Sequence, residues 1–223
     1  MRQAPASKKP QDRYETALLG LVAYRELSAF ERLSSDARFS PTLVDRESLA
    51  RLAVAEFGHY ELVREHIAAK GLDIQETMEP FIESIDALHE RTKPGDWYES
   101  LIKAYVIDEV SADFYRAISQ QLGDEARTLV ASVQTSEQQT GWLRERLRLS
   151  LCDDPRLASR LALWGRRLLG EALTQARSIG EQYDYWGAAD AVAHNDSTQP
   201  MTALFAHLVE NHSRRMSALG LTA

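Results

Sequence analysis

The chain has 223 residues and a net charge of −7, and its composition, 44% hydrophobic and 26% charged, is that of an ordinary globular protein. The acidic balance argues against a dedicated nucleic-acid-binding module, which usually presents a basic face. No apolar stretch approaches the roughly 20 residues that a membrane span requires. A single cysteine, Cys152, excludes an internal disulfide and fits a reducing compartment. We therefore expect a soluble, cytoplasmic protein without a membrane partner.

Helix signals dominate the chain after its first eleven residues. Residues 1–11 lack the apolar segment of a signal peptide, and we predict that they form a disordered tail. Asp12, Asp73 and Asp96 each precede a glutamate by three residues, which is the spacing of a capping box at a helix start. Pro155 follows an aspartate, where the missing N–H of a proline costs nothing. Strand signals are absent, so the sequence predicts an all-α fold.

Seven helices follow from these starts and from the proline and glycine stops between them. They are predicted over 12–38, 45–70, 75–92, 96–122, 124–150, 154–182 and 200–219. The first, second, fourth and fifth are long enough to cross a bundle. The short third helix lies in a long connection, and ferritin-like bundles use such a crossover to make their middle helices parallel. We therefore expect a ferritin-like four-helix bundle over 12–150, with C-terminal helices in 151–223 packed on it as part of the same domain.

The predicted helix 154–182 contains two glycines, Gly165 and Gly170. Glycine lowers helix propensity by about 1 kcal/mol relative to alanine, so its presence inside a helix calls for a structural reason. Close approach of a neighbouring helix supplies that reason, and we expect such a contact at both positions.

Three of the four bundle-crossing helices place a carboxylate on the apolar face near mid-length. Glu26 lies on this face of the first helix and Asp108 on that of the third. Glu56 and His59 lie on the face of the second, three residues apart, and therefore point the same way. A divalent cation would compensate three buried carboxylates, and Glu-x-x-His is the motif of di-iron bundles. We predict that these four residues bind metal; the alternative is a set of edge-exposed or protonated carboxylates and a histidine satisfied within the core.

The fourth bundle-crossing helix, 124–150, departs from this pattern. Its apolar face carries Ser136 and Gln139 where a second carboxylate-x-x-His pair would complete a di-metal site. Neutral side chains are weak ligands for a hard divalent metal. Glu137 lies about 100° around the helix from Ser136, so it would reach the site only if the helix rotated or bulged. These three residues are weaker candidates, and the predicted site is incomplete.

Four segments of the chain resemble the MiaE-like ferritin-like proteins, and in particular an actinobacterial branch of that group. They are AYRELSAFERL (23–33), LAVAEFGHYELVREH (52–66), KAYVIDEVSADFYR (103–116) and RLALWGRRLLGEALTQA (160–176). The similarity extends from about Tyr14 to Leu221. MiaE is a tRNA hydroxylase that acts on 2-methylthio-isopentenyl-adenosine.

The resemblance implies a non-haem iron hydroxylase with one or two iron ions, and tRNA as a substrate. It gives ligand roles to Glu26, Glu56, His59 and Asp108. It also implies that Ser136 and Gln139 stand where the family has an acidic residue and a histidine. A site with three carboxylates and one histidine would then hold a single metal ion, or the protein would be free of metal.

Two further interpretations stay open. A non-catalytic bundle that has lost the second metal could serve in binding or assembly, for instance as a homodimer, through the aromatic residues Trp164, Tyr183, Tyr185 and Trp186. The start of the last third is rich in arginines, which form either a solvated helix face or a face that contacts the phosphates of RNA. These are Arg144, Arg146, Arg148, Arg156, Arg160, Arg166 and Arg167.

Overall fold

The computed structural model describes residues 10–134, 137–152, 154–183 and 199–222, and these residues form helices and no strand. The all-α prediction is therefore confirmed. The helices are α1 (Pro10–Asp36), η1 (Ala37–Phe39), α2 (Leu43–Ala69), α3 (Ile74–Arg91), α4 (Trp97–Ile118), η2 (Ser119–Gln121), α5 (Asp124–Ser132), α6 (Glu137–Leu151), α7 (Pro155–Gln182) and α9 (Gln199–Ala218). Most of the predicted tail, residues 1–9, lies outside the described part. None of the described helices is both long and apolar enough to cross a membrane.

Side-chain caps fix most of the helix starts that the sequence predicts. The carboxylates of Asp73, Asp96 and Asp154 each accept backbone N–H groups in the first turn of the helix that follows. Thr42 caps α2 in the same way. Asp12 does not cap α1, because that helix begins at Pro10 and Asp12 lies in its first turn. There a negative charge still interacts favourably with the helix dipole.

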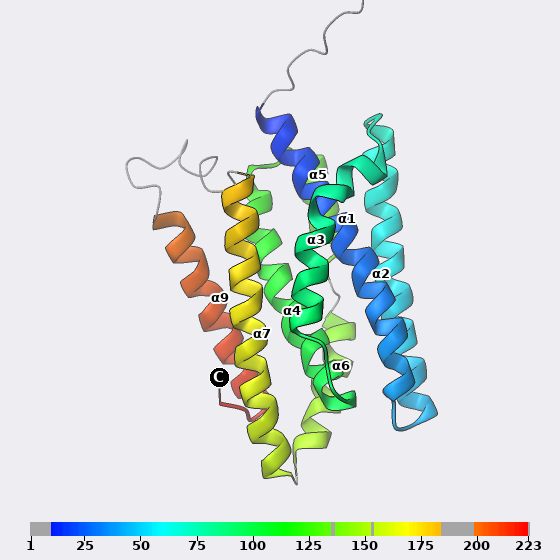
Figure 1. Ribbon diagram of the computed structural model, residues 1–223, viewed down its shortest axis with the longest axis vertical. Helices are drawn as coiled ribbons and strands as arrows, with labels where there is room; N and C mark the ends of the chain where they lie inside the picture. Colours follow the sequence, from blue (N-terminus) through cyan, green and yellow to red (C-terminus); the bar gives the residue numbers. More distant parts are fainter. Residues whose placement is uncertain (1–9, 135–136, 153, 184–198, 223) are drawn as a thin grey trace, which may run out of the picture.

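The long connection makes the two middle helices of the bundle parallel. The ammonium group of Lys70 lies 2.6 Å from a carboxylate oxygen of Glu15, which sets α2 antiparallel to α1. Arg25 of α1 contacts Asp108 of α4, and the hydroxyl of Tyr14 donates to the carbonyl of Ile118, so α4 is also antiparallel to α1. The connection between α2 and α4 is α3, which packs against α1 and α7 (Figure 1).

The predicted helix 124–150 is wrong as a single element, since it is divided into α5 and α6. Val133, Thr135 and Ser136 have low helix propensity and weaken a continuous helix there. Ser136 and Gln139 also have the Ser-x-x-Gln spacing of a capping box, which predicts a new helix start at that point. Ser136 itself lies outside the described residues.

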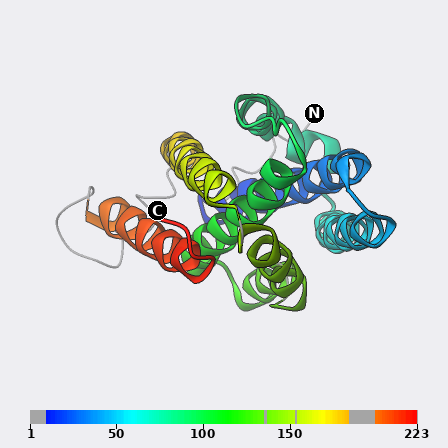
Figure 2. The ribbon, with the colours of Figure 1, turned by 90° about the horizontal axis from the view of Figure 1, so that it is seen from below.

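The C-terminal helices pack on the same core. Figure 2 shows α4 near the centre of the molecule, and it contacts α1, α5, α6, α7 and α9. Asp113 of α4 is buried and accepts two hydrogen bonds from Arg215 and one from Asn211, both on α9. These charge-assisted bonds attach the last helix to the bundle.

The two glycines of α7 have different environments. A Cβ atom on Gly165 would lie 2.5 Å from the terminal methyl carbon of Met216 on α9, so the predicted close helix contact is confirmed there. Around Gly170 nothing lies within 4 Å of such an atom, and the predicted contact is wrong. Gly170 is a helix-weakening residue that packing does not explain.

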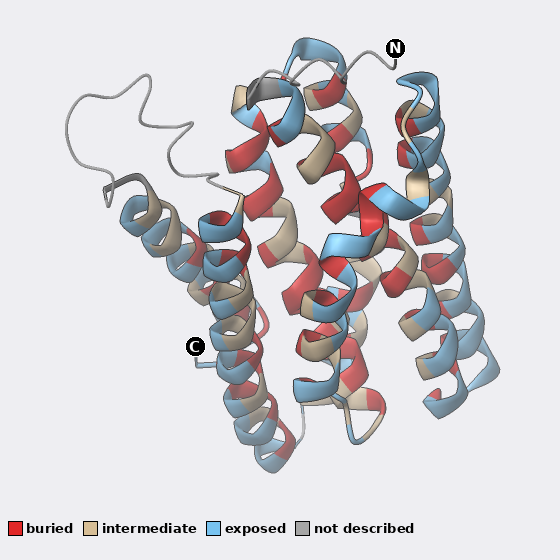
Figure 3. Ribbon diagram, turned by 45° about the horizontal axis from the view of Figure 1, so that its top comes forward, coloured by how far each residue is buried: buried red, intermediate tan, exposed pale blue. Residues whose placement is uncertain are grey.

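The apolar core consists of two clusters, one toward each end of the bundle. On α1 the first cluster includes Leu18 and the second Leu33; on α4 the first includes Phe114 and the second Leu101. The buried residues face inward on every helix (Figure 3). Between the clusters, at mid-length, α1, α2 and α4 bury the ionisable residues of the predicted site. The α5–α6 break lies at the same level, because Val133 belongs to the first cluster and Leu143 to the second.

Candidate metal centre

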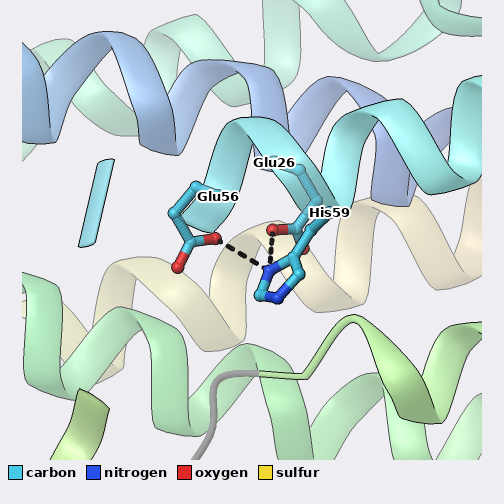
Figure 4. Close-up of side chains that lie close together, drawn as sticks. All are labelled: Glu26, Glu56 and His59. Carbon is cyan, nitrogen blue, oxygen red and sulfur yellow. Dashed lines mark ion pairs between the residues drawn. The ribbon is translucent and has the colours of Figure 1, made fainter. Parts of the chain in front are cut away.

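Glu26, Glu56 and His59 converge in the middle of the bundle. The Nδ1 atom of His59 lies 3.5 Å from Oε2 of Glu26 and 3.7 Å from Oε2 of Glu56. One ligand atom from each residue lies within 4.8 Å of the other two. Figure 4 shows how the three side chains point toward one another, Glu26 from α1 and the other two from successive turns of α2. The Glu-x-x-His spacing of α2 produces this arrangement, because residues three apart share a helix face.

The three atoms that converge have no hydrogen-bond partner. Oε2 of Glu26, Oε2 of Glu56 and Nδ1 of His59 are all buried and unsatisfied, and both glutamates are 1% exposed. Separations of 3.5 and 3.7 Å are too long for good hydrogen bonds between them. Buried polar atoms in proteins are nearly always hydrogen-bonded, so three unsatisfied ones at one point indicate a site for another partner, although a protonated His59 would form ion pairs with both carboxylates.

A divalent transition-metal ion fits this donor set. Two ligand atoms that are each about 2.0–2.2 Å from one ion are separated by at most about 4.4 Å, which is close to the observed spacing. Two carboxylates and an imidazole are donors that zinc, iron and manganese accept. Three protein ligands leave further coordination positions open, which is typical of catalytic rather than structural sites.

Asp108, the fourth predicted ligand, does not join this cluster. It is buried as expected, but its Oδ1 atom accepts a hydrogen bond from Nη2 of Arg25 at 2.6 Å. Nη1 of the same guanidinium donates to Oε1 of Glu26 at 2.6 Å and lies 3.9 Å from Oε2 of Glu56. Arg25 therefore supplies positive charge to the three carboxylates on the side of the cluster that faces Asp108.

Arg25 is the functional residue that the sequence analysis missed. It is 7% exposed, although a guanidinium is rarely buried unless it is paired. Its position gives a signal in retrospect, because Arg25 lies seven residues after Leu18 and four before Ala29, on the apolar face of α1. Arg32 lies seven residues further along the same side.

The cluster is strongly polarised by burial and by its own charges. Burial, together with the charge of Glu26, raises the pKa of Glu56 to about 7. Burial is the largest influence on the pKa of Glu26 and would raise it, but the adjacent guanidinium of Arg25, together with His59 and Glu56, holds that pKa below its usual value. Burial opposes protonation of His59, yet the two flanking carboxylates raise its pKa to about 9. A proton on His59 thus supplies part of the positive charge that a metal ion would supply.

The weaker ligand candidates lie wholly or partly outside the described residues. Ser136 is one of them, and of Glu137 and Gln139 only the backbone, in the first turn of α6, is described. The described chain ends α5 at Ser132 and begins α6 at Glu137.

The aromatic residues proposed for assembly are partly engaged in packing. Tyr183 stacks on Phe81, with ring centroids 4.9 Å apart, and the guanidinium of Arg167 lies over the ring of Trp164. Tyr185 and Trp186 lie outside the described residues. The described members of this set are therefore half-buried rather than free.

Most of the arginine cluster is also engaged within the chain. Arg146 forms two hydrogen bonds with Asp45, and Arg160 contacts both Asp96 and Glu99. Three further guanidinium groups have partners in the described structure; they belong to Arg148, Arg166 and Arg167. A guanidinium that is already paired is less able to contact RNA phosphates.

The fold and the cluster together define the class of protein. A helical bundle with a crossover between parallel middle helices, and with carboxylates and a histidine converging from neighbouring helices at mid-length, has the architecture of the ferritin-like proteins. The model of the family described as "Ferritin-like domain, actinomycetes" matches residues 11–189, and the chain belongs to that family. No curated protein matches the chain. The family match defines the fold and does not distinguish a MiaE-like group within it.

Proposed function

We propose that the protein binds a single divalent transition-metal ion through Glu26, Glu56 and His59. The observation that carries this proposal is the convergence of three buried donor atoms that have no hydrogen-bond partner. A di-iron bundle uses a Glu-x-x-His motif on each of two helices. This chain has one such motif on α2, and Arg25 occupies the side of the cluster that faces Asp108. One ion is therefore the expected content.

Iron is the metal that the MiaE-like resemblance favours, and hydroxylation of a substrate C–H bond is the reaction it suggests. An iron ion with open coordination positions supplies oxygen activation when it is bound. The chain's own residues supply the environment: Arg25 helps to keep Glu26 ionised, and an apolar cluster packs on either side of the middle of the bundle. The tRNA substrate receives no support from the arginine cluster, so we do not include it in the proposal.

Metal content tests the proposal directly. We expect elemental analysis of the full chain, purified without chelator and reloaded with iron, manganese or zinc, to give one ion per chain. Glu56→Gln and His59→Leu should each abolish tight binding. Glu61→Gln, an exposed carboxylate on the same helix, is the matched control and should bind normally.

Two outcomes would contradict this assignment. Two ions per chain would show that Arg25 does not replace a second metal. No ion from any of the three metals would show that the cluster is satisfied by protons alone. If iron binds, oxygen consumption in the presence of a reductant tests the oxidoreductase part separately from metal binding.

A non-catalytic assembly protein is the second candidate, and the outer face of α2 favours it. Leu43, Val44 and Val54 are 78%, 72% and 68% exposed on this helix. Apolar side chains that gather on one face mark a protein contact more often than chance. A homodimer through this face would dissociate in Val54→Lys, and sedimentation of the variant against the wild-type chain measures it. A monomeric wild-type chain would remove this candidate.

A further inference from the structure

A cavity lies beside the metal centre, between α1, α3, α4 and α7. The space between its lining atoms amounts to about 540 Å³ when the open solvent at its mouth is counted. Most of its wall is apolar, with Leu21, Ile85, Ile107, Val110 and Phe114 among the lining residues. Glu26, Glu56 and His59 do not line it, but Arg25 does, so one guanidinium is common to the cavity and to the metal centre.

The polar part of this cavity carries hydrogen-bond donors without acceptors. Nε of Arg25 and Nη1 of Arg32 are buried and unsatisfied, and both residues line the cavity. Nδ1 of His89, a third lining residue, is also buried without a partner. A guanidinium donates up to five hydrogen bonds and accepts none. A bound group that satisfies the two guanidinium atoms must therefore be an acceptor, and an anionic acceptor forms the stronger bonds.

The charges around the cavity indicate how much negative charge it accepts. Two positive and three negative side chains meet at mid-length: Arg25, Arg32, Glu26, Glu56 and Asp108. With the carboxylates ionised and His59 neutral as a ligand, their sum is −1. Binding of a divalent ion changes the sum to +1, and this step rests on the proposed function. Lys103 and Asp36, one basic and one acidic residue, line a neighbouring cavity together with Arg32.

We infer that this cavity binds a small organic monocarboxylate with an apolar body. The carboxylate accepts hydrogen bonds from Arg25 and Arg32, and the body lies against the apolar walls. A monoanion neutralises the metal-loaded centre, whereas a dianion such as a phosphate monoester would leave it negative. Because the metal ligands do not line the cavity, arginine rather than the metal holds the carboxylate.

Calorimetric titration of the full chain with hexanoate tests the assignment. The zinc-loaded protein is used because zinc excludes redox chemistry, and the same titration is repeated in EDTA. Four further probes are titrated for comparison. Acetate tests the length of the apolar body, 1-hexanol the presence of charge, hexylamine the sign of the charge, and inorganic phosphate an anion without an apolar body. We expect hexanoate to bind at least tenfold more tightly than any of them.

Two variants address the two ends of the cavity. Arg32→Gln should weaken hexanoate at least tenfold, while Arg46→Gln, an exposed arginine on α2, should leave it unchanged. Ala172→Phe fills the apolar part from α7 and should abolish binding. Circular dichroism of each variant verifies the fold, and Arg32→Gln still reports on the site if Ala172→Phe does not fold.

The outcomes separate this inference from the metal proposal. If one zinc ion binds and hexanoate does not, or if 1-hexanol or phosphate binds as tightly, the cavity assignment is wrong and the metal proposal stands. Unchanged affinity in Arg32→Gln also overturns the assignment. If hexanoate binds equally with zinc and in EDTA and requires Arg32, the cavity assignment is supported and the charge contribution of a metal is not.

Discussion

At the scale of single residues, the middle of the bundle buries charges that water would otherwise stabilise. Arg25 bonds to both Glu26 and Asp108, so each of these charges has a partner. A buried ion pair adds little net stability, because desolvation offsets the attraction between its charges. Removal of one partner is costly, because the remaining charge is left buried and unpaired.

Arg25→Met should therefore destabilise the metal-free protein strongly. Two carboxylates lose their shared donor, and the free energy of unfolding should fall by about 3–5 kcal/mol. Urea unfolding in EDTA measures this change. The double variant Arg25→Met with Asp108→Leu should recover part of the loss, because it removes one of the unpaired charges. A loss below about 1 kcal/mol in the single variant would mean that water reaches these carboxylates.

The sequence predicted the ligand cluster but not its countercharge, for a physical reason. A glutamate on an apolar stripe is conspicuous, because a short side chain cannot reach solvent from there; this is how Glu26 and Glu56 were found. An arginine at the same place usually extends its long side chain to the surface. Whether Arg25 does so depends on the neighbouring helices, and the sequence of α1 alone does not contain that information.

A buried histidine on α9 should make the stability of the protein depend on pH. His212 is 2% exposed, and burial, reinforced by the charge of Arg215, lowers its pKa to about 4. The unfolded chain has a His pKa near 6.5, so the unfolded state binds more protons between these values. The contribution of His212 to stability is complete above pH 6.5 and is lost as the pH falls toward 4.

His212→Leu should reduce the loss of stability between pH 7 and pH 4.5 by about 2–3 kcal/mol. Urea unfolding at the two pH values measures the difference. The exposed His207, one turn earlier on the same helix, gives the matched control His207→Leu, which should keep the wild-type pH dependence. Equal pH dependence in both variants would show that His212 is not the group that titrates.

At the scale of helices, the close approach of α1 and α3 depends on one glycine. A Cβ atom on Gly20 would lie 2.1 Å from the carbonyl oxygen of Thr77, which is a backbone atom and cannot move alone. The hydroxyl of Tyr24 donates to the carboxylate of Asp86 further along the same pair of helices. The crossover helix is therefore held against α1 at backbone distance.

Gly20→Ala should lower the free energy of unfolding by at least about 1–3 kcal/mol, because the two helices must separate. Gly58→Ala is the matched control, since it lies inside α2 and a Cβ atom there meets nothing within 4 Å. That substitution should stabilise the protein by up to about 1 kcal/mol through helix propensity. Thermal unfolding of both variants gives the comparison, and a neutral Gly20→Ala would contradict the close packing.

The presence of the helices and their approximate ends could be predicted from capping residues and the spacing of apolar residues, and the predicted all-α class was confirmed. The undivided helix 124–150 was wrong because its apolar spacing continues across the break: Val133 and Leu143 are both buried. Periodicity alone does not register the local chemistry of Thr135 and Ser136. The capping-box spacing from Ser136 to Gln139 was available in the sequence and indicates the break.

At the scale of the whole molecule, a polar layer at mid-length separates the two apolar clusters. This layer consists of Arg25, Glu26, Glu56, His59 and Asp108. The chain thus has less apolar contact at mid-length than at either end, and the charges there are balanced only approximately. A ligand that binds this layer in the folded state alone stabilises the entire chain by mass action. The metal proposal therefore has a consequence for unfolding, independent of any activity.

Zinc should raise the unfolding temperature in a concentration-dependent way. At a free concentration one hundred times the dissociation constant, the gain is about 2.7 kcal/mol. Glu56→Gln should lose this gain, whereas Glu61→Gln should retain it. Scanning calorimetry over a zinc titration measures the effect, and an equal response of both variants would assign it to nonspecific binding.

The polar layer also fixes the register of the helices. Apolar contacts are non-directional, so they specify the alignment of two helices less strictly than a charged pair does. A slip of one turn moves a helix by about 5.4 Å. Such a slip would take the guanidinium of Arg25 out of reach of Asp108, which it now contacts at 2.6 Å, and leave the carboxylate of Asp108 buried without this partner. We infer that the charges which cost the bundle stability also select one alignment of α1, α2 and α4 from several that the apolar residues alone would permit.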